Sequence, residues 1–200
     1  MTPGPVTSGA EATSPVTTSA GAAPAVTASA GAAAAGRRGV LVLVGFMGAG
    51  KTTVGRLLAA ELGVPFTDSD LVIEERAGRP IRQIFADDGE PAFRQLEHEV
   101  IADLLNGTDM VLAVGGGAVE HGLTRKLLAE ARVAYLRVSF AEVLVRVGGD
   151  GGRPMLARPD IADVYQERQA AYSSVATITV DVDRRLPEHI GTDILARLRP

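Results

Sequence analysis

The sequence predicts an α/β domain in which helices cover both faces of a parallel β-sheet. From Val40 to the C-terminus, short β-rich runs alternate with longer segments that have helical spacing. Two of the runs, 40–44 and 110–115, are apolar on both faces, which is typical of inner strands in a parallel sheet. The chain has 200 residues, 46% of them apolar, which is enough for one domain with a core.

Five runs are predicted to be strands, and their alternation with helices predicts right-handed βαβ crossovers. The first is the buried run VLVLV, and VPFTD follows as a short strand. The third, MVLAVG, is wholly apolar, and VAYLRV and TITVDV complete the sheet. The predicted strands span 40–44, 64–68, 110–115, 133–138 and 177–182.

Helical spacing marks the segments between and after these strands. The first helix, 53–62, is expected to stop at Gly63. The residues expected on its inner face are Val54, Leu57, Leu58 and Leu62. A longer helix, 91–105, is expected to turn inward Phe93, Leu96, Val100, Ile101 and Leu104. The other predicted helices span 71–78, 81–89, 123–131, 141–148, 162–176 and 187–198.

Composition excludes several classes of function. The formal net charge of −4 is mild and does not indicate a nucleic-acid surface. The chain has no cysteine, so disulfides and thiolate zinc sites are excluded. It has no run of about 18 apolar residues, so no transmembrane helix is expected.

The N-terminal 36 residues differ from the rest of the chain. Residues 1–36 are mostly Ala, Gly, Ser, Thr and Pro, whose side chains bury too little surface to offset chain entropy. They lack the basic start and leucine-rich core of a secretory signal. We therefore expect a disordered tail over 1–36 and a folded domain over 37–200. A tether or a processed leader is the alternative interpretation of the tail.

The stretch GFMGAGKT, residues 45–52, has the pattern of a phosphate-binding loop between a strand and a helix. Its glycines let backbone N–H groups converge on a polyphosphate at the helix N-terminus. Lys51 supplies positive charge for the β and γ phosphates, and the Thr52 hydroxyl is a candidate magnesium ligand. The residues expected to bind nucleotide are Gly48, Ala49, Gly50, Lys51, Thr52 and Thr53. The guanine motif N-K-x-D is missing, which favours ATP.

Two carboxylates, Asp68 and Asp70, follow the second predicted strand. Residues two apart in an extended segment point to the same side, and ligands of open α/β sheets bind at the carboxyl ends of strands. One carboxylate could hold magnesium through water, and the other could orient a hydroxyl or take its proton. Capping of the next helix by Ser69 or Asp70 is the structural alternative.

Glycines and arginines complete the candidate site. Gly115, Gly116 and Gly117 follow the third strand, where they allow close approach of backbone N–H groups to a ligand or form a simple tight turn. Three arginines stand in segments that could reach a carboxylate or a phosphate, although each alone could be a surface residue. They are Arg94, with Glu97 one helical turn on, Arg153 in a glycine-rich segment expected to be a mobile flap, and Arg168.

The set of motifs resembles the shikimate kinase family over the whole folded part. The segments are GFMGAGKTTVGRLLA, FTDSDLVIEERAGRPIRQIFADDGEPAFRQLE, VLAVGGGAV, GGRPML and ERQAAY, in that order. The resemblance implies an adenylate-kinase-like P-loop fold with three layers and a five-stranded parallel sheet of order 2-3-1-4-5. It also implies transfer of phosphate from ATP, with Mg²⁺, to the 3-hydroxyl of shikimate in aromatic amino acid biosynthesis.

The resemblance further implies a role for each candidate residue. Asp70 would bind the reacting hydroxyl and act as base, and Asp68 would hold magnesium through water beside Thr52. Arg94 and Arg168 would bind the shikimate carboxylate, while Gly115, Gly116 and Gly117 would line the substrate. Arg153, on the lid, would reach the phosphates and act with Lys51 in catalysis. The segment VDVDRRLP, residues 180–187, would be the adenine loop, with Arg184 or a neighbour near the base.

Two departures from the family pattern stand out. Met155 occupies a lid position where leucine is expected, a volume-conserving exchange that should matter little. The N-terminal tail lies outside the pattern. By resemblance we expect a cytoplasmic monomer that binds shikimate and ATP and neither nucleic acid nor membrane.

Three rival functions remain at this stage, of which a nucleic-acid or structural partner protein is disfavoured by the acidic balance and the absence of a basic stripe. A gluconate kinase of the same fold would differ in its acceptor, and substrate screening separates the two. A regulatory module that uses ATP only as a signal would need no acceptor pocket, which the set of Asp70, Arg94 and Arg168 argues against.

Overall fold

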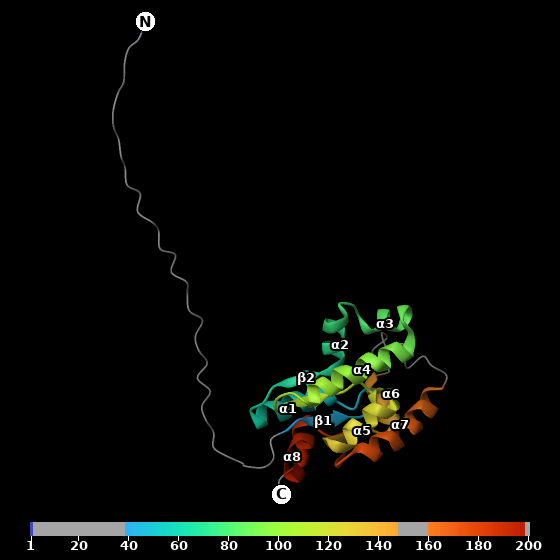
Figure 1. Cartoon of the computed structure of the whole chain (residues 1–200). Helices are drawn as coiled ribbons and strands as arrows, with labels where there is room; N and C mark the ends of the chain where they lie inside the picture. Colours follow the sequence, from blue (N-terminus) through green and yellow to red (C-terminus); the bar gives the residue numbers. More distant parts are fainter. Residues whose placement is uncertain (2–38, 148–159, 199–200) are drawn as a thin grey trace. The chain divides into compact units, whose positions relative to one another are not determined.

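The computed structural model describes Met1, residues 39–147 and residues 160–198 (Figure 1). The predicted tail beyond Met1 and the predicted lid with Arg153 and Met155 lie outside the described residues. The rest of the predicted domain is described nearly in full, so the predictions for its sheet, its helices and its main site can be compared with the structure.

The sheet has five parallel strands in the order β2-β3-β1-β4-β5, as the resemblance implied. Every predicted strand is present, although several are shorter than expected. The strands are β1 (Leu41–Val44), β2 (Phe66–Asp68), β3 (Val111–Ala113), β4 (Arg132–Arg137) and β5 (Ile178–Asp181). The central strands β1 and β3 are buried along their whole length, which explains their continuous apolar sequence.

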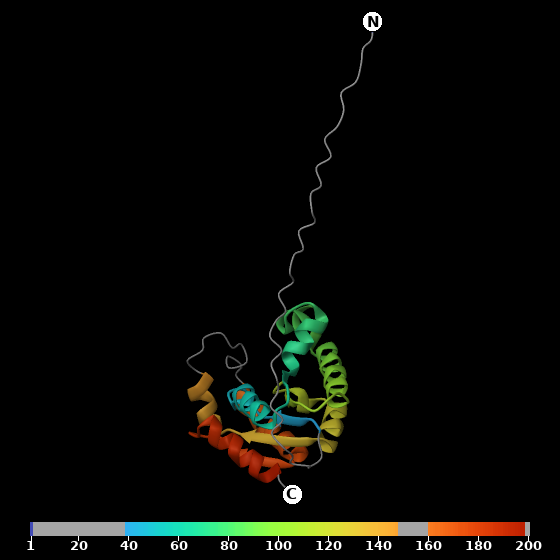
Figure 2. The same cartoon turned by 90° about the vertical axis from the view of Figure 1, so that its left-hand side faces the viewer.

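Helices lie on both sides of the sheet (Figures 1 and 2). The described helices are α1 (Lys51–Leu62), α2 (Ser69–Ala77), α3 (Ile81–Asp87), α4 (Gly89–Leu105), α5 (Gly122–Glu130), α6 (Phe140–Val147), α7 (Ile161–Val175) and α8 (Pro187–Leu198). A 3-10 turn, η1 (Ala118–Glu120), precedes α5. Contacts join α1 to α8, and a second set joins α4 to α5 and α5 to α7.

The strand order explains this division of the helices. The crossover from β1 to β2 runs in one direction across the sheet, whereas those from β2 to β3, from β3 to β4 and from β4 to β5 run in the other. Because the crossovers are right-handed, α1 lies on the face opposite α4, α5 and α7. The reversal occurs between the neighbouring strands β1 and β3. Such a reversal point opens a crevice at the carboxyl ends of the strands, where ligands bind in open α/β sheets.

The strand register brings three loops to one level. Asp68 pairs with Ala113, and Ala113 pairs with Leu43. Two residues further on, the chain reaches Asp70 from β2, Gly115 from β3 and Gly45 from β1. The acidic segment, the glycine run and the phosphate-binding loop therefore start at the same edge of the sheet.

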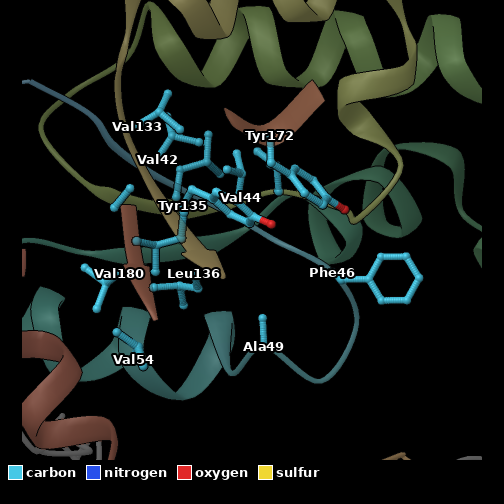
Figure 3. Close-up of a cluster of buried hydrophobic side chains, with 14 of the residues drawn as sticks. Val42, Val44, Phe46, Ala49, Val54, Val133, Tyr135, Leu136, Tyr172 and Val180 are labelled. Atoms are coloured by element: carbon cyan, nitrogen blue, oxygen red, sulfur yellow. The ribbon is translucent and has the colours of Figure 1, made fainter. Parts of the chain in front are cut away.

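The main core lies between the sheet and its helices, as Figure 3 shows for part of it. Side chains from β1, β4 and β5 meet residues from α1 and α7, among them Val54 and Tyr172. A second, smaller core lies beneath α2, α3 and α4 and consists of Ile73, Ile84, Phe93 and Val100. It packs the helices that stand next to the β2 edge of the sheet.

The structure corrects two details of the sequence prediction, the inner face of α1 and the end of α3. In α1, Leu57 and Leu62 are exposed by 37% and 43%, and Gly55 and Ala59 complete the inner face with Val54 and Leu58 instead. Small residues belong on that face because Gly55 lies against the Phe66 ring. Helix α3 ends at Asp87 and not at Gly89, which takes a left-handed φ of 81° and begins α4.

The inward face of α4 agrees with the prediction and has one addition. Phe93, Val100 and Ile101 are buried, and Leu96 and Leu104 are partly buried and pack against the smaller core. Glu97, which was not expected on this face, is buried as well, to an exposed fraction of 1%. No helix in the described ranges is long and apolar enough to cross a membrane.

The neighbours Leu57 and Leu58 provide a test of this packing. We expect Leu58→Ala to lower the free energy of unfolding by about 2–5 kcal/mol, because Leu58 is 1% exposed and its loss leaves a cavity. Leu57→Ala should cost about 1 kcal/mol or less, because Leu57 is partly in water. Urea denaturation of both variants measures the difference. Equal losses would contradict the orientation of α1.

Candidate active site

The phosphate-binding loop connects β1 to α1. Gly48 and Gly50 have φ angles of 76° and 90°, which glycine adopts without strain, and these turns curl the loop as predicted. No described side chain caps α1, whose preceding residue is Gly50. Its first residues, Lys51, Thr52 and Thr53, all line one cleft. The helix therefore offers backbone N–H groups and its positive dipole end to an anion in that cleft.

Lys51 crosses back over this loop. Its Nζ donates to the carbonyl oxygen of Gly45 at 2.8 Å and approaches that of Phe46 at 3.4 Å. The ammonium is only partly buried and lines the cleft. These contacts tie the Lys51 side chain to the first residues of the loop. Ala49 lies beneath the loop and is buried in the main core.

Asp68 and Thr52 meet at the mouth of the loop. The Thr52 hydroxyl donates to Asp68 Oδ2 at 3.2 Å, although the two residues are 16 positions apart. Asp68 also caps α2, because its Oδ1 accepts from the backbone N–H of Asp70 at 3.1 Å. The capping residue is therefore Asp68, and not Ser69 or Asp70 as the structural alternative had it. Asp70 remains directed to the cleft, which it lines.

The carboxyl of Asp70 lies in a partly buried position in the middle of the cleft. Burial, first, and then the nearby charge of Asp68 raise its pKa above the ordinary value. Lys51 and Arg94 oppose the rise, so cations flank the carboxyl and temper its proton affinity. A carboxylate with a raised pKa accepts a proton more readily, as a general base must.

The glycine run after β3 allows side chains to cross very close to the backbone. A Cβ at Gly115 would lie 2.7 Å from both Asp70 Oδ1 and Glu97 Oε1, and one at Gly117 would collide with the Arg94 guanidinium. Gly115 donates its N–H to Ser69 Oγ at 3.1 Å, and Gly116 accepts from the Tyr172 hydroxyl. The run is thus both a turn and one wall of the cleft.

Arg94 and Arg168 lie in the same part of the cleft, the acceptor end, and both contact Glu120. Arg94, from α4, has a side chain 13% exposed, and Arg168, from α7, one 8% exposed. Arg94 Nη1 donates to the buried Glu97 at 2.8 Å, which confirms the predicted pairing within α4. Burial raises the pKa of Glu97, and Arg94 opposes that rise. Each guanidinium also lies over an aromatic ring, Phe93 for Arg94 and Phe46 for Arg168.

Several residues at the site did not emerge from the sequence. Ser69, fully buried, holds the glycine run to α2, and Tyr172 holds it to α7. Glu120 in η1 contacts both arginines. Ser69 and Tyr172 lie in two of the segments that carry the family resemblance, but local spacing predicted no such contact for them or for Glu120, since each acts on a partner from a distant segment. Only the position of Glu120, three residues after the glycine run, could have drawn attention to it.

The nucleotide end has a further arginine. Arg146, in α6, donates from Nη1 to the Gly48 carbonyl at 3.1 Å and from Nη2 to the Val182 carbonyl at 2.8 Å. It therefore ties the phosphate-binding loop to the segment 180–187. Arg184, the residue predicted for the adenine contact, is exposed in that segment and does not line the described cleft.

One cleft of about 550 Å³ is lined by the phosphate-binding loop with Lys51 and Thr52, by Asp70, by the glycine run and by Arg94 and Arg168. The charges of Lys51 and Arg94 both act on Asp70, and the glycine run lies against Asp70 and Arg94, which places Asp70 and the run between the loop at one end and the two arginines at the other. A polyphosphate and a small anionic molecule can therefore be held with a proton acceptor between them. The arrangement suits transfer of a phosphoryl group to a hydroxyl of the small molecule.

Comparison with known proteins shows which family this chain resembles. A family model described as shikimate kinase matches residues 47–199. The chain is 48% identical to a shikimate kinase of Mycobacterium avium over 161 residues, which are 78% of this chain and 92% of that protein. It is 46% identical to a shikimate kinase of Thermobifida fusca over 166 residues, 82% of this chain and 96% of that protein.

The fold agrees with the sequence comparisons. The structure is similar to that of shikimate kinase from Acinetobacter baumannii in complex with shikimate, with a TM-score of 0.74 and 37% sequence identity. The similarity covers 79% of this chain and 91% of that one. On the combined agreement of motifs, fold and relatives, this chain belongs to the shikimate kinase family.

Proposed function

We propose that this enzyme transfers the γ-phosphoryl group of ATP to the 3-hydroxyl of shikimate in aromatic amino acid biosynthesis. The observation that carries the proposal is one cleft lined by the phosphate-binding loop, by Asp70 and by the largely buried side chains of Arg94 and Arg168. Membership of the shikimate kinase family supports both substrates. We propose that residues 37–200 form the kinase domain, which acts as a cytoplasmic monomer.

The acceptor end matches the chemistry of shikimate, which carries one carboxylate and three hydroxyls. Arg94 and Arg168 would bind the carboxylate, because guanidinium groups hold a carboxylate in a bidentate way. The glycine run would line the ring, with Gly116 and Gly117 closest to it. Asp70 would accept the hydrogen bond of the reacting hydroxyl.

Asp70 would then serve as base for the transfer. Burial, first, and then Asp68 raise its pKa and so make it a stronger proton acceptor than an exposed aspartate, while Lys51 and Arg94 favour its ionised form. Lys51 and the N–H groups of residues 48–53 would neutralise charge on the phosphates. Because the transition state is loose, positioning and charge account for most of the catalysis.

The described residues fit a magnesium ion at the mouth of the loop. Thr52 and Asp68 bring two oxygen donors within 3.2 Å of each other, and Mg²⁺ prefers oxygen donors. We propose that Thr52 binds the ion directly and Asp68 through water. When bound, the ion would neutralise phosphate charge. In the described ranges no group of three or more acidic, His or Cys side chains is arranged to hold a metal ion, and Mg²⁺ at ATP sites retains several waters.

Two proposed nucleotide contacts complete the assignment. Arg184, or a neighbour in 180–187, would contact the adenine, since Arg146 holds that segment beside the loop. Arg153 would reach the transferring phosphate from the lid. Closure of a lid would keep water from accepting the phosphoryl group.

The reaction can be tested first through Asp70. We expect ADP release from ATP and magnesium to depend on shikimate in the wild type and to fall by about 10²–10⁴-fold in Asp70→Ala, since the base and the hydroxyl contact are both lost. A coupled ADP assay with shikimate, gluconate or no acceptor measures this. Turnover with gluconate alone would contradict the proposed acceptor.

Arg94 offers a test of the carboxylate contact. We expect Arg94→Ala to weaken shikimate binding by about 2–5 kcal/mol, because Arg94 is nearly buried and its loss leaves Glu97 unpaired. The matched control is Arg76→Ala, which removes a surface ion pair with Asp103 and should leave binding unchanged. Titration calorimetry with shikimate compares them. Normal affinity in Arg94→Ala would refute the contact.

The raised pKa of Asp70 predicts that this carboxyl serves catalysis at a cost to the stability of the fold. A carboxyl whose pKa is higher in the folded state favours folding at low pH and loses that contribution as pH rises through its folded pKa. Ionised Asp70 should therefore destabilise the ligand-free enzyme at neutral pH. We expect inactive Asp70→Asn to be more stable than wild type at pH 7–8, and a gain of about 1 kcal/mol would raise Tm by roughly 2–4 °C.

The sign of this effect is checked by its pH dependence. Thermal unfolding of both proteins without ligand, from pH 4 to pH 8, should show the advantage of Asp70→Asn shrinking toward acid, where wild-type Asp70 becomes protonated. An advantage that grew toward acid would mean that the folded state lowers the pKa of Asp70.

A further inference from the structure

Glu120 joins the two arginines of the acceptor end through one carboxylate. Its Oε2 accepts from Arg94 Nη2 at 2.7 Å, and its Oε1 accepts from Arg168 Nε at 2.9 Å. We propose that Glu120 is a positioning residue that sets the spacing and orientation of the two guanidiniums for the substrate carboxylate. The ligand in this inference rests on the proposed function, whereas the ordering of the arginines is a property of the enzyme without ligand.

Glu120 reaches the arginines from outside the cleft. Arg94 and Arg168 both line the cleft, but Glu120 does not. On Arg168 it occupies the Nε–H, and no acceptor among the described residues is bonded to the four N–H groups of the two terminal nitrogens, which can therefore serve a ligand. On Arg94 the bridge uses Nη2, which also pairs with Glu90. The Glu120 carboxylate thus fixes both guanidinium groups and leaves other N–H groups of the arginines for the substrate.

Two buried cations need such a partner. The Arg94 and Arg168 side chains are only 13% and 8% exposed, and like charges repel strongly where water is excluded. Glu97 compensates Arg94, but among the described residues Glu120 is the one acidic side chain paired with Arg168. Without Glu120 the guanidinium of Arg168 would lose its ion pair and the charge that draws it toward Arg94.

The backbone of Glu120 is itself fixed. Arg125 Nη1 donates to the carbonyl oxygens of Val119 at 2.8 Å and of Glu120 at 3.2 Å. The next residue, His121, shares the buried Thr124 hydroxyl with His98, and each Nδ1 lies 3.2 Å from Thr124 Oγ1. Because His98 is on α4, this bridge ties η1 to the helix that carries Arg94. The position of Glu120 is therefore set by the fold before substrate binds.

An opposite role for Glu120 would be competition with the substrate carboxylate for the arginines. The geometry argues against it, since Glu120 bonds Arg168 at Nε and lies outside the cleft lining. The two roles predict opposite changes in affinity when the carboxylate is removed.

The kinetic test compares wild type with Glu120→Gln. Glutamine keeps the volume but can accept at one arginine only, because its NH₂ group would face the other guanidinium. We expect the KM for shikimate to rise about tenfold, which corresponds to about 1.4 kcal/mol. We expect kcat and the KM for ATP to stay within about twofold, since the phosphate end is untouched.

The matched control is Glu99→Gln, which removes one negative charge from the exposed face of α4. Glu99 pairs with Gln95 and contacts neither arginine, so its variant should keep the wild-type KM for shikimate. An unchanged or lower KM in Glu120→Gln would overturn the inference, and the lower value would establish competition. A fall in kcat with both KM values unchanged would also overturn it.

A second readout needs no substrate. Proton–nitrogen NMR of the arginine Nε–H groups in the ligand-free enzyme should show a slowly exchanging Arg168 signal, because Glu120 holds that proton. The protection should be lost in Glu120→Ala, which has no side-chain acceptor, and kept in Glu99→Gln. Protection that survives in Glu120→Ala would refute the positioning role. If the variant loses the protection but the wild type does not turn over shikimate, the proposed substrate is wrong and the positioning role still holds.

Discussion

The register of three parallel strands is the constraint on which the rest of the site depends. Pairing of Asp68 with Ala113, and of Ala113 with Leu43, ends β2, β3 and β1 at one level. A shift of one residue in β2 would turn Asp68 and Asp70 away from the phosphate-binding loop, since side chains alternate between the two faces. The contact from Thr52 to Asp68 and the bond from Gly115 to Ser69 both require this alignment.

Two kinds of packing hold the aligned loops in place. The main core fixes β1, β3 and α1, which hold the phosphate-binding loop and so the nucleotide half of the site. The smaller core, between α2, α3 and α4, fixes α4, whose Arg94 and Glu97 belong to the acceptor half. The two cores are joined by Leu104, which packs against both. Polar and aromatic contacts add to this link: Tyr172 bonds Gly116, and Arg168 from α7 lies over Phe46 of the loop. The acceptor half is thus joined to the nucleotide half partly through residues that form the walls of the cleft.

Sequence alone predicted the features that depend on neighbours along the chain. The loop at 45–52, the carboxylates after β2, the pair of Arg94 with Glu97 and all five strands follow from local spacing, and the sheet order came from the family resemblance. It erred at Leu57 and Leu62, because helical spacing allows a wider apolar face than the sheet and α8 cover. Local spacing could not predict the contacts of Ser69, Glu120 and Arg146, because their partners lie 46, 26 and 98 positions away in the sequence.

The charges at the acceptor end explain how the site could select a ligand. Arg94 and Arg168 face Glu90, Glu97 and Glu120 in ion pairs before any substrate enters, so the cluster has no excess of positive charge to attract anions in general. An anion that binds there must gain from hydrogen bonds to donors already in place, because their ordering costs it little. A carboxylate on a small ring that fits against the glycine run meets that condition. A bulkier anion or one with its charge elsewhere would meet repulsion from Asp70 and Glu97, which also line the cleft.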